Sequence, residues 1–196
     1  MKMILNRCVD EIAALAGPGV GVIELGSGSS RKTPLLLSAL EAPDGYVPVD
    51  VSAGFLKASV QALQAQFPTL PMEHVVADFM QLDALPAMAS AARRRLVFFP
   101  GSTIANLAPD AAVDLLRRMS RLAGTGALLV LGADATLDPS LLLPAYADAQ
   151  GVTEAFNKNL LTRMNRELGA DFDLDSFRHA ARYDTRQRRM EMHLVS

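Results

Sequence analysis

Residues 24–33 have the sequence ELGSGSSRKT and follow a short apolar run. Two glycines, at positions 26 and 28, permit a tight turn and a close approach of the backbone to a ligand. If a helix begins after this turn, its first free N–H groups can bind polar ligand atoms. The segment therefore predicts a loop that holds a nucleotide or nucleoside, and three known types of loop compete to explain it.

Two of these loop types bind phosphates, and the sequence matches each of them incompletely. The dinucleotide-binding fingerprint needs a third glycine where Arg31 stands. A P-loop, which cradles the phosphates of a nucleoside triphosphate, would match at Gly26, Lys32 and Thr33, but Arg31 replaces its second glycine. An arginine side chain at that position would obstruct the phosphate cradle, so the interpretation as a P-loop phosphate binder ranks last.

The third type is the loop that binds S-adenosylmethionine, in which one acidic residue precedes Gly-x-Gly and another ends the next strand. Glu24 and Asp50 are these two residues. A carboxylate at the end of the second strand can accept hydrogen bonds from both ribose hydroxyls of an adenosine. Asp78 ends the following strand, where it can face the adenine amino group while Phe79 packs against the base. Each residue alone is more often an ordinary loop residue, but together they favour an adenosine pocket.

A fourth polar segment is FFPGSTIANL at residues 98–107. Gly101 would let the chain pass close beside a ligand, and Thr103 and Asn106 can donate and accept hydrogen bonds without adding charge. The same residues could form no more than a capped turn before a helix that begins at Pro109. Their position at the end of the fourth predicted strand favours a role in binding.

Alternating strands and helices would bring these residues to one edge of a sheet. Apolar runs predict strands at residues 20–25, 46–49, 74–77, 96–99 and 127–131. Helical spacing predicts helices at residues 4–16, 33–41, 52–66, 84–92 and 109–123, with Ser52 as the cap of the third. The pattern predicts an α/β fold with a doubly wound, mostly parallel, Rossmann-like sheet, whose ligand crevice lies at the carboxyl ends of its strands.

The period of the pattern changes after Asp134. Residues 138–149 and 152–168 predict helices, and residues 177–183 and 189–195 alternate as the two strands of an antiparallel hairpin. We therefore expect an S-adenosylmethionine-binding domain at residues 1–134 and a partial α+β substrate-binding domain at residues 135–196. Met190 and Met192, on the second strand of the hairpin, are expected to lie in its core.

Composition excludes several other classes of protein. The chain has 196 residues, 50% hydrophobic and 20% charged, with a formal net charge of −2, and lacks the basic surplus that binds nucleic acid. Cys8 is the single cysteine, so neither an internal disulfide nor a cysteine-based zinc site can form. The apolar runs are far shorter than a membrane span, and the first residues do not form a signal peptide. We expect a cytoplasmic protein without a metal site.

Several stretches resemble the histidine Nα-methyltransferase family of ergothioneine biosynthesis, namely ELGSGSSRK, YVPVDVS, VVADF, FFPGSTIANL and AFNKNLLTRMNRELGADFDLDSF followed by MEMHLVS. The resemblance runs along nearly the whole chain. It implies a class I methyltransferase domain that binds S-adenosylmethionine and a second domain that helps to enclose histidine, whose α-amino group is trimethylated to hercynine. Related members act on other amino acids, including tryptophan derivatives.

The resemblance also implies roles for individual residues. The methyl donor would be contacted by Gly26, Lys32, Asp50, Asp78 and Phe79. The amino acid would be held by Gly101, Asn106 and Tyr146, of which the last two suit its carboxylate and amino ends. Methyl transfer from a sulfonium requires alignment of a neutral amine rather than a strong base, so no catalytic residue is assigned. The three histidines, His74, His179 and His193, are accordingly expected to be structural.

Members of the family extend beyond both ends of this sequence. The resemblance implies that the part after the hairpin carries a glutamate and a serine that bind the imidazole, followed by the last two strands of the sheet. It also implies that a segment before Met1 carries tyrosines that close over donor and substrate. The chain could thus be an amino-acid N-methyltransferase, or a shortened, catalytically silent donor-binding chain that needs a partner. The strand at residues 127–131 would form an exposed sheet edge, which predicts self-association.

Overall fold

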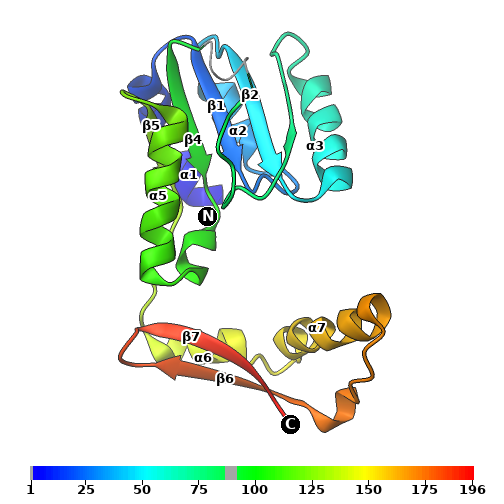
Figure 1. The fold of residues 1–196 in the computed structure, drawn as a ribbon. Helices are drawn as coiled ribbons and strands as arrows, with labels where there is room; N and C mark the ends of the chain where they lie inside the picture. Colours follow the sequence, from blue (N-terminus) through cyan, green and yellow to red (C-terminus); the bar gives the residue numbers. More distant parts are fainter. Residues whose placement is uncertain (1, 87–91) are drawn as a thin grey trace. The chain divides into compact units, whose positions relative to one another are not determined.

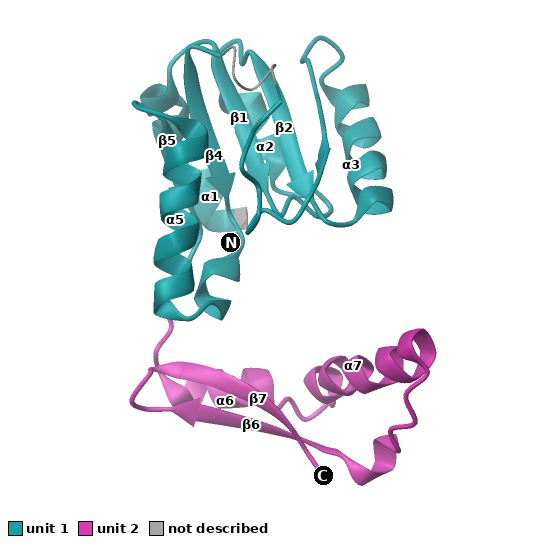
Figure 2. Cartoon of the chain, in the orientation of Figure 1, with its two compact units in different colours: residues 1–134 teal, residues 135–196 magenta. Residues whose placement is uncertain are grey.

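The computed structural model describes residues 2–86 and 92–196 (Figure 1). The chain divides into two compact units, residues 1–134 and residues 135–196, which Figure 2 colours separately. Among the described residues, no helix is both long and apolar enough to cross a membrane.

Unit 1 contains, in its described residues, a five-stranded parallel sheet. The strands are β1 (Val20–Leu25), β2 (Gly45–Asp50), β3 (Val75–Val76), β4 (Arg94–Phe99) and β5 (Leu128–Leu131). Their spatial order is β3-β2-β1-β4-β5, and each pair of neighbours is parallel. All six residues of β1 are buried, as expected for a central strand that is covered on both faces. The predicted α/β class is confirmed.

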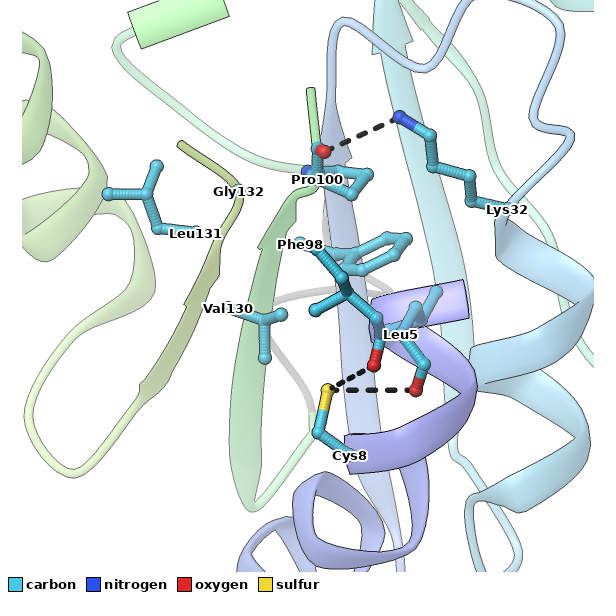
Figure 3. Close-up of a pocket in the computed structure, with 9 residues that line it drawn as sticks. Leu5, Cys8, Lys32, Phe98, Pro100, Val130, Leu131 and Gly132 are labelled. Carbon is cyan, nitrogen blue, oxygen red and sulfur yellow. Dashed lines mark hydrogen bonds between the residues drawn. The ribbon is translucent and has the colours of Figure 1, made fainter. Parts of the chain in front are cut away.

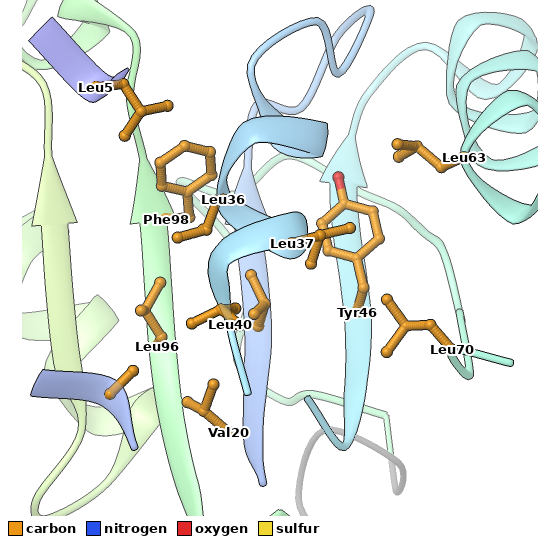
Figure 4. Close-up of a cluster of buried hydrophobic side chains, with 12 residues drawn as sticks. Leu5, Val20, Leu36, Leu37, Leu40, Tyr46, Leu63, Leu70, Leu96 and Phe98 are labelled. Atoms are coloured by element: carbon orange, nitrogen blue, oxygen red, sulfur yellow. The ribbon is translucent and has the colours of Figure 1, made fainter. Parts of the chain in front are cut away.

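Helices cover both faces of this sheet. On one face, α1 (Lys2–Ala16), α2 (Thr33–Ala39) and Leu63 of α3 (Ala53–Gln66) contribute to an apolar cluster with Val20 and Val22 (Figure 4). On the other face, α5 (Pro109–Ala123) contributes to a second cluster with Ile23 and Leu25. Because side chains alternate along a strand, Glu24 shares the first face with Val20 and Val22.

The predicted elements of unit 1 agree with the structure at their centres and differ at their ends. The third strand is Val75–Val76 rather than 74–77, and α2 ends at Ala39 rather than at residue 41. Ser52 precedes α3 as predicted, but its side chain makes no capping bond, and its N–H donates to Oδ1 of Asp50 at 2.9 Å. Most of the predicted helix at residues 84–92 lies outside the described residues, and residues 84–86 are not helical.

Unit 2 combines two α-helices, α6 (Pro139–Tyr146) and α7 (Val152–Leu168), with the antiparallel strands β6 (Arg178–Asp184) and β7 (Arg189–Val195). The predicted hairpin is confirmed. Helix α6 ends at Tyr146 rather than at residue 149, because Ala147 leaves the helical conformation. The expectation that Met192 lies in a core is wrong, since the residue is 39% exposed. Within the described residues the hairpin sheet has two strands, so both strands are edges and keep contact with solvent.

Candidate functional site

The glycine-rich loop at residues 26–32 connects the end of β1 to the start of α2. Gly26 and Gly28 have φ angles of +65° and +50°, which favour glycine. The N–H groups of Gly26 and Ser27 both donate to the carbonyl oxygen of Val49, at 2.8 and 3.1 Å, so the loop folds over the end of β2. A Cβ atom at Gly26 would lie 3.3 Å from the ring of Phe79. The first predicted glycine is therefore needed both for its backbone conformation and for close packing.

The Asp50 carboxylate, at the end of β2, is held from two sides. Its Oδ2 accepts a hydrogen bond of 2.8 Å from the N–H of Gly28, and its Oδ1 accepts one of 2.9 Å from the N–H of Ser52. Each carboxylate oxygen can accept a further hydrogen bond. Asp50 is partly exposed, so the fixed carboxylate can bind hydroxyl groups of a ligand placed over the loop.

Asp78 and Phe79 follow β3 and lie beside Asp50 and the loop. The N–H of Ala77 donates to the carbonyl oxygen of Asp50 at 3.1 Å, which joins the ends of β2 and β3. The exposed carboxylate of Asp78 accepts a hydrogen bond of 2.8 Å from the N–H of Met80. The Phe79 ring lies against Gly26 and meets the ring of Phe99 edge-on, with centroids 5.5 Å apart. The structure therefore brings Gly26, Asp50, Asp78 and Phe79 together at the carboxyl edge of the sheet.

Lys32 connects the loop to the chain that follows β4. Its Nζ donates to the carbonyl oxygen of Pro100 at 3.4 Å (Figure 3). It lines a cavity of about 80 Å³ that is otherwise mostly apolar. The other lining residues come from α1, β4, β5 and the residues that follow these two strands, namely Ile4, Leu5, Cys8, Phe98, Pro100, Val130, Leu131 and Gly132. Of the residues predicted for the site, Lys32 lines this cavity.

The residues expected to bind the amino acid lie in both units. Gly101 precedes the short 3-10 helix η1 (Ser102–Asn106), and Asn106 is exposed at the end of η1. Tyr146 belongs to unit 2, where it is the last residue of α6. Its carbonyl oxygen accepts a hydrogen bond of 2.7 Å from Nε2 of His179. Gly101 and Asn106 thus follow the end of β4, which is also where Lys32 contacts the carbonyl oxygen of Pro100.

His179 has a complete set of hydrogen bonds that fits a structural role. Because a carbonyl oxygen can only accept, its Nε2 must carry the proton, and its Nδ1 then accepts from the side-chain amide of Asn157 at 3.0 Å. The same amide nitrogen donates to the carbonyl oxygen of His193 at 3.1 Å. These bonds join α6, α7 and both strands of the hairpin.

Sequence reasoning missed the partners of Glu24. The Glu24 side chain is 3% exposed, and its Oε2 accepts hydrogen bonds of 2.6 Å from both Thr33 Oγ1 and Tyr46 Oη. Burial raises the pKa of the Glu24 carboxyl from 4.5 to about 7. A useful signal was the two-residue period of β1 and β2, because Tyr46 pairs with Val22 and thus shares a face with Glu24.

One hydroxyl in the loop supports the fit of a polar ligand. Ser27 Oγ is the buried side-chain polar atom that has no hydrogen-bond partner among the described residues. Buried hydroxyls are normally paired, so this exception in the loop is a position that a polar ligand or a water molecule would complete. The two carboxylates of Asp50 and Asp78 accept hydrogen bonds, and the Phe79 ring lies beside the glycine turn. This arrangement suits a nucleoside that carries a positive charge.

Comparison with known proteins identifies the family of this chain. A family model described as histidine-specific, S-adenosylmethionine-dependent methyltransferase matches residues 2–196. The chain is 42% identical to histidine N-alpha-methyltransferase of Mycolicibacterium smegmatis over 195 residues, which cover 97% of this chain and 59% of that protein. It is 41% identical to the protein of the same name from Mycobacterium tuberculosis, over 88% of this chain and 54% of that one. The chain thus spans somewhat more than half the length of these relatives.

Solved structures support the fold. The small RNA methyltransferase HEN1 matches with a TM-score of 0.55 and 12% identity, over 92% of this chain and 22% of that chain. The mitomycin 7-O-methyltransferase MmcR matches with a TM-score of 0.50 and 16% identity, over 71% and 40% of the two chains. At these identities the likeness concerns the fold alone. The family match along residues 2–196 shows that this chain belongs to the family of histidine-specific, S-adenosylmethionine-dependent methyltransferases.

Proposed function

We propose that this chain binds S-adenosylmethionine and takes part in methylation of the α-amino group of an amino acid, with L-histidine as the substrate and hercynine as the product. The observation that carries the proposal is the convergence of Gly26, Asp50, Asp78 and Phe79 at one edge of the sheet. Family membership supports both the donor and the substrate.

Each residue of this group has a defined task toward the donor. Asp50, held by Gly28 and Ser52, accepts hydrogen bonds from the ribose hydroxyls. Asp78 accepts one from the adenine amino group, and Phe79 packs on the base. Gly26 keeps the loop clear for the ligand, and Lys32 contacts the donor from the side of Pro100. When bound, the donor supplies an electrophilic methyl group on a sulfonium.

The residues expected to hold the substrate align its amine behind that methyl group. Gly101 leaves room for the amino acid, and Asn106 binds one of its polar ends. Tyr146, in unit 2, is the further residue that the family resemblance assigns to the amino acid. The transfer is an in-line displacement on a carbon that is already electrophilic, so positioning supplies most of the rate enhancement. The chain needs no strong base, and His179 keeps the structural role described above.

The interpretation as a phosphate-binding P-loop is less well supported. In such a loop, the lysine reaches the phosphates that lie over the loop. Here the Nζ of Lys32 donates to the carbonyl oxygen of Pro100, after β4. Arg31 stands where the second glycine of a P-loop would be, and its side chain is exposed. A nucleoside donor without a triphosphate fits this arrangement better.

A second candidate function is a donor-binding chain that turns over only with further polypeptide. It is favoured by the edge of the sheet at β5. Among the described residues β5 pairs only with β4, and Leu129 and Leu131 of β5 are 43% and 39% exposed. Exposed apolar edges favour pairing with another strand, so self-association through β5 is part of this proposal. Light scattering that shows a monomer at high concentration would argue against it.

Two measurements test these functions together. Calorimetric titration with S-adenosylmethionine and with its demethylated product measures donor binding. Mass spectrometry of a panel of amino acids incubated with the chain and the donor then detects methylation. Trimethylated histidine would support the enzyme, and binding without any gain in mass would favour the silent donor-binding chain. Absence of binding to both nucleosides would refute the proposal.

A further inference from the structure

Four buried polar side chains form a hydrogen-bonded cluster beneath the glycine-rich loop. Glu24, Ser30, Thr33 and Tyr46 are 3%, 5%, 0% and 0% exposed. Tyr46 Oη and Thr33 Oγ1 both donate to Oε2 of Glu24 at 2.6 Å, and Ser30 Oγ lies 3.4 Å from Tyr46 Oη. Figure 4 shows the Tyr46 ring standing on β2 within an otherwise apolar cluster. The cluster joins β1, β2, the loop and α2.

The cluster fixes the part of the loop with the least favourable backbone. Ser30 has a φ angle of +48°, in the left-handed region that is unfavourable for residues with a Cβ. Its N–H donates to the carbonyl oxygen of Ser27 at 2.9 Å, and its own carbonyl oxygen accepts from the N–H of Thr33 at 3.2 Å. Ser30 is therefore held by backbone bonds along the loop and by the buried hydroxyl of Tyr46 from below.

Some of the groups around Glu24 raise the pKa of its carboxyl, and others lower it. Desolvation is the largest cause of its raised pKa, and the charge of Asp50 raises it further. The hydrogen bonds from Thr33 and Tyr46 and the charge of Lys32 lower the pKa. On the neighbouring strands, the residues paired with Glu24 are Pro48 and Phe98, which carry no charge. The two charged groups that act on Glu24, Lys32 and Asp50, are both among the residues proposed to contact the donor. The ionisation of Glu24 is therefore coupled to two groups of the proposed donor site.

We infer that Glu24 is a positioning residue that holds the glycine-rich loop through Tyr46, Thr33 and Ser30, and that its ionised form makes the loop favour a cationic sulfonium donor over the neutral thioether product. The inference rests on the proposed function. A buried carboxylate is stabilised by a nearby cation, which in turn binds more tightly when the carboxylate is ionised. The product lacks the sulfonium charge, so its binding should not depend on the ionisation of Glu24. Donor binding would thus release a proton from Glu24 near neutral pH, whereas product binding would not.

The test compares donor and product binding by calorimetry at pH 6, 7 and 8, in buffers of different ionisation enthalpy. For the unmodified chain, the Kd of S-adenosylmethionine should fall on the order of tenfold from pH 6 to pH 8. A change of this size is expected if donor binding lowers the pKa of Glu24 by about one unit. The Kd of S-adenosylhomocysteine should change much less. In Glu24→Gln, which keeps an acceptor oxygen but does not ionise, this difference between the ligands should disappear. Glu73→Gln, on an exposed side chain, is the matched control and should behave like the unmodified chain.

Tyr46→Phe and a measurement without ligand distinguish this inference from a purely structural role. Removal of one hydrogen bond to the ionised carboxylate should move the pH midpoint of donor binding upward. Carbon-13 NMR of the Glu24 carboxyl should show titration near pH 7 and a higher midpoint in Tyr46→Phe. Donor binding with the same pH dependence in Glu24→Gln would overturn the inference and leave the proposed function intact. A Glu24 midpoint near 4.5 would overturn it whether or not the donor binds.

Discussion

The backbone N–H of Gly28 donates a 2.8 Å hydrogen bond to Oδ2 of Asp50, so the turn after β1 is tied directly to the last residue of β2. The other oxygen of the same carboxylate accepts from the N–H of Ser52. Both oxygens of Asp50 accept from N–H groups. In Asp50→Asn, the NH₂ group of the amide would therefore face one of these N–H donors, and that hydrogen bond would be lost. Asp50 thus anchors the loop, and in the proposed function it also contacts the ligand that the loop presents.

Asp50→Asn should weaken donor binding at least tenfold, since a hydrogen bond to a charged group is worth about 1.5–3 kcal/mol. Calorimetry with S-adenosylmethionine measures this change. Asp44 is exposed and directly precedes the first residue of β2. Asp44→Asn is the control and should bind the donor with unchanged affinity. Equal donor affinity in the two variants would show that Asp50 does not contact the ligand.

Gly26→Ala should destabilise unit 1 and weaken donor binding. The φ angle of +65° is strained for alanine, and the added Cβ would lie 3.3 Å from the Phe79 ring. A left-handed conformation costs roughly 1–2 kcal/mol for a residue with a Cβ, so we expect a loss of about that size in chemical denaturation. Phe79 would also have to move away from the place where a base would stack.

Gly54→Ala in α3 is the matched control for this substitution. A Cβ at Gly54 meets no atom within 4 Å, and its φ is not in the left-handed region. Because alanine favours a helix over glycine by about 1 kcal/mol, this variant should be slightly more stable than the unmodified chain. Stabilisation by both substitutions would mean that the loop does not hold Gly26 in the conformation described.

The stability of the chain should fall as the pH rises through neutrality because of Glu24. Burial raises its pKa from 4.5 to about 7, so between these values the folded chain binds more protons than the unfolded chain. The contribution of Glu24 to stability is therefore fully present below about pH 4.5 and is lost as the pH rises through 7. One pKa unit corresponds to about 1.4 kcal/mol, so the loss amounts to roughly 3 kcal/mol.

Glu24→Gln removes this dependence, because the amide does not titrate. At pH 8 the variant should be more stable than the unmodified chain in urea denaturation, and the difference should shrink toward pH 5. Glu73→Gln should show no such trend. If the stability of Glu24→Gln relative to the unmodified chain were lower at pH 8 than at pH 5, the stability difference would change with pH in the opposite direction. That result would contradict the raised pKa of Glu24.

Local patterns in the sequence predicted the strand ends, and non-local contacts account for what they missed. Gly26, Asp50 and Asp78 could be assigned because each directly follows or ends a short apolar run, and parallel strands bring such ends to one edge. Tyr46 was missed because its bond to Glu24 spans 22 residues and depends on the register of β1 and β2. The contact between Lys32 and Pro100 spans 68 residues. The left-handed conformation of Ser30 could not be predicted, because serine does not favour that conformation.

The hydrogen bonds around His179 predict its tautomer and the effect of removing its partner. Nitrogen-15 NMR should show that the neutral ring of His179 carries its proton on Nε2, because that atom donates to the carbonyl oxygen of Tyr146. Asn157→Ala should leave Nδ1 of His179 and the carbonyl oxygen of His193 without their donor. An unsatisfied buried group costs about 1–3 kcal/mol, and these partly exposed groups should cost toward the lower end.

Asn159→Ala, on an exposed residue of the same helix, is the control and should leave the stability of unit 2 unchanged or slightly increased. Because His179 holds the carbonyl oxygen of Tyr146, Asn157→Ala should also loosen the end of α6 and raise the KM for the amino acid more than it lowers kcat. A neutral His179 ring with its proton on Nδ1 would contradict this arrangement, since Nε2 would then have no hydrogen to donate to Tyr146. If Asn157→Ala lowers the stability but leaves the KM unchanged, the role of His179 is structural and it does not position Tyr146 for the substrate.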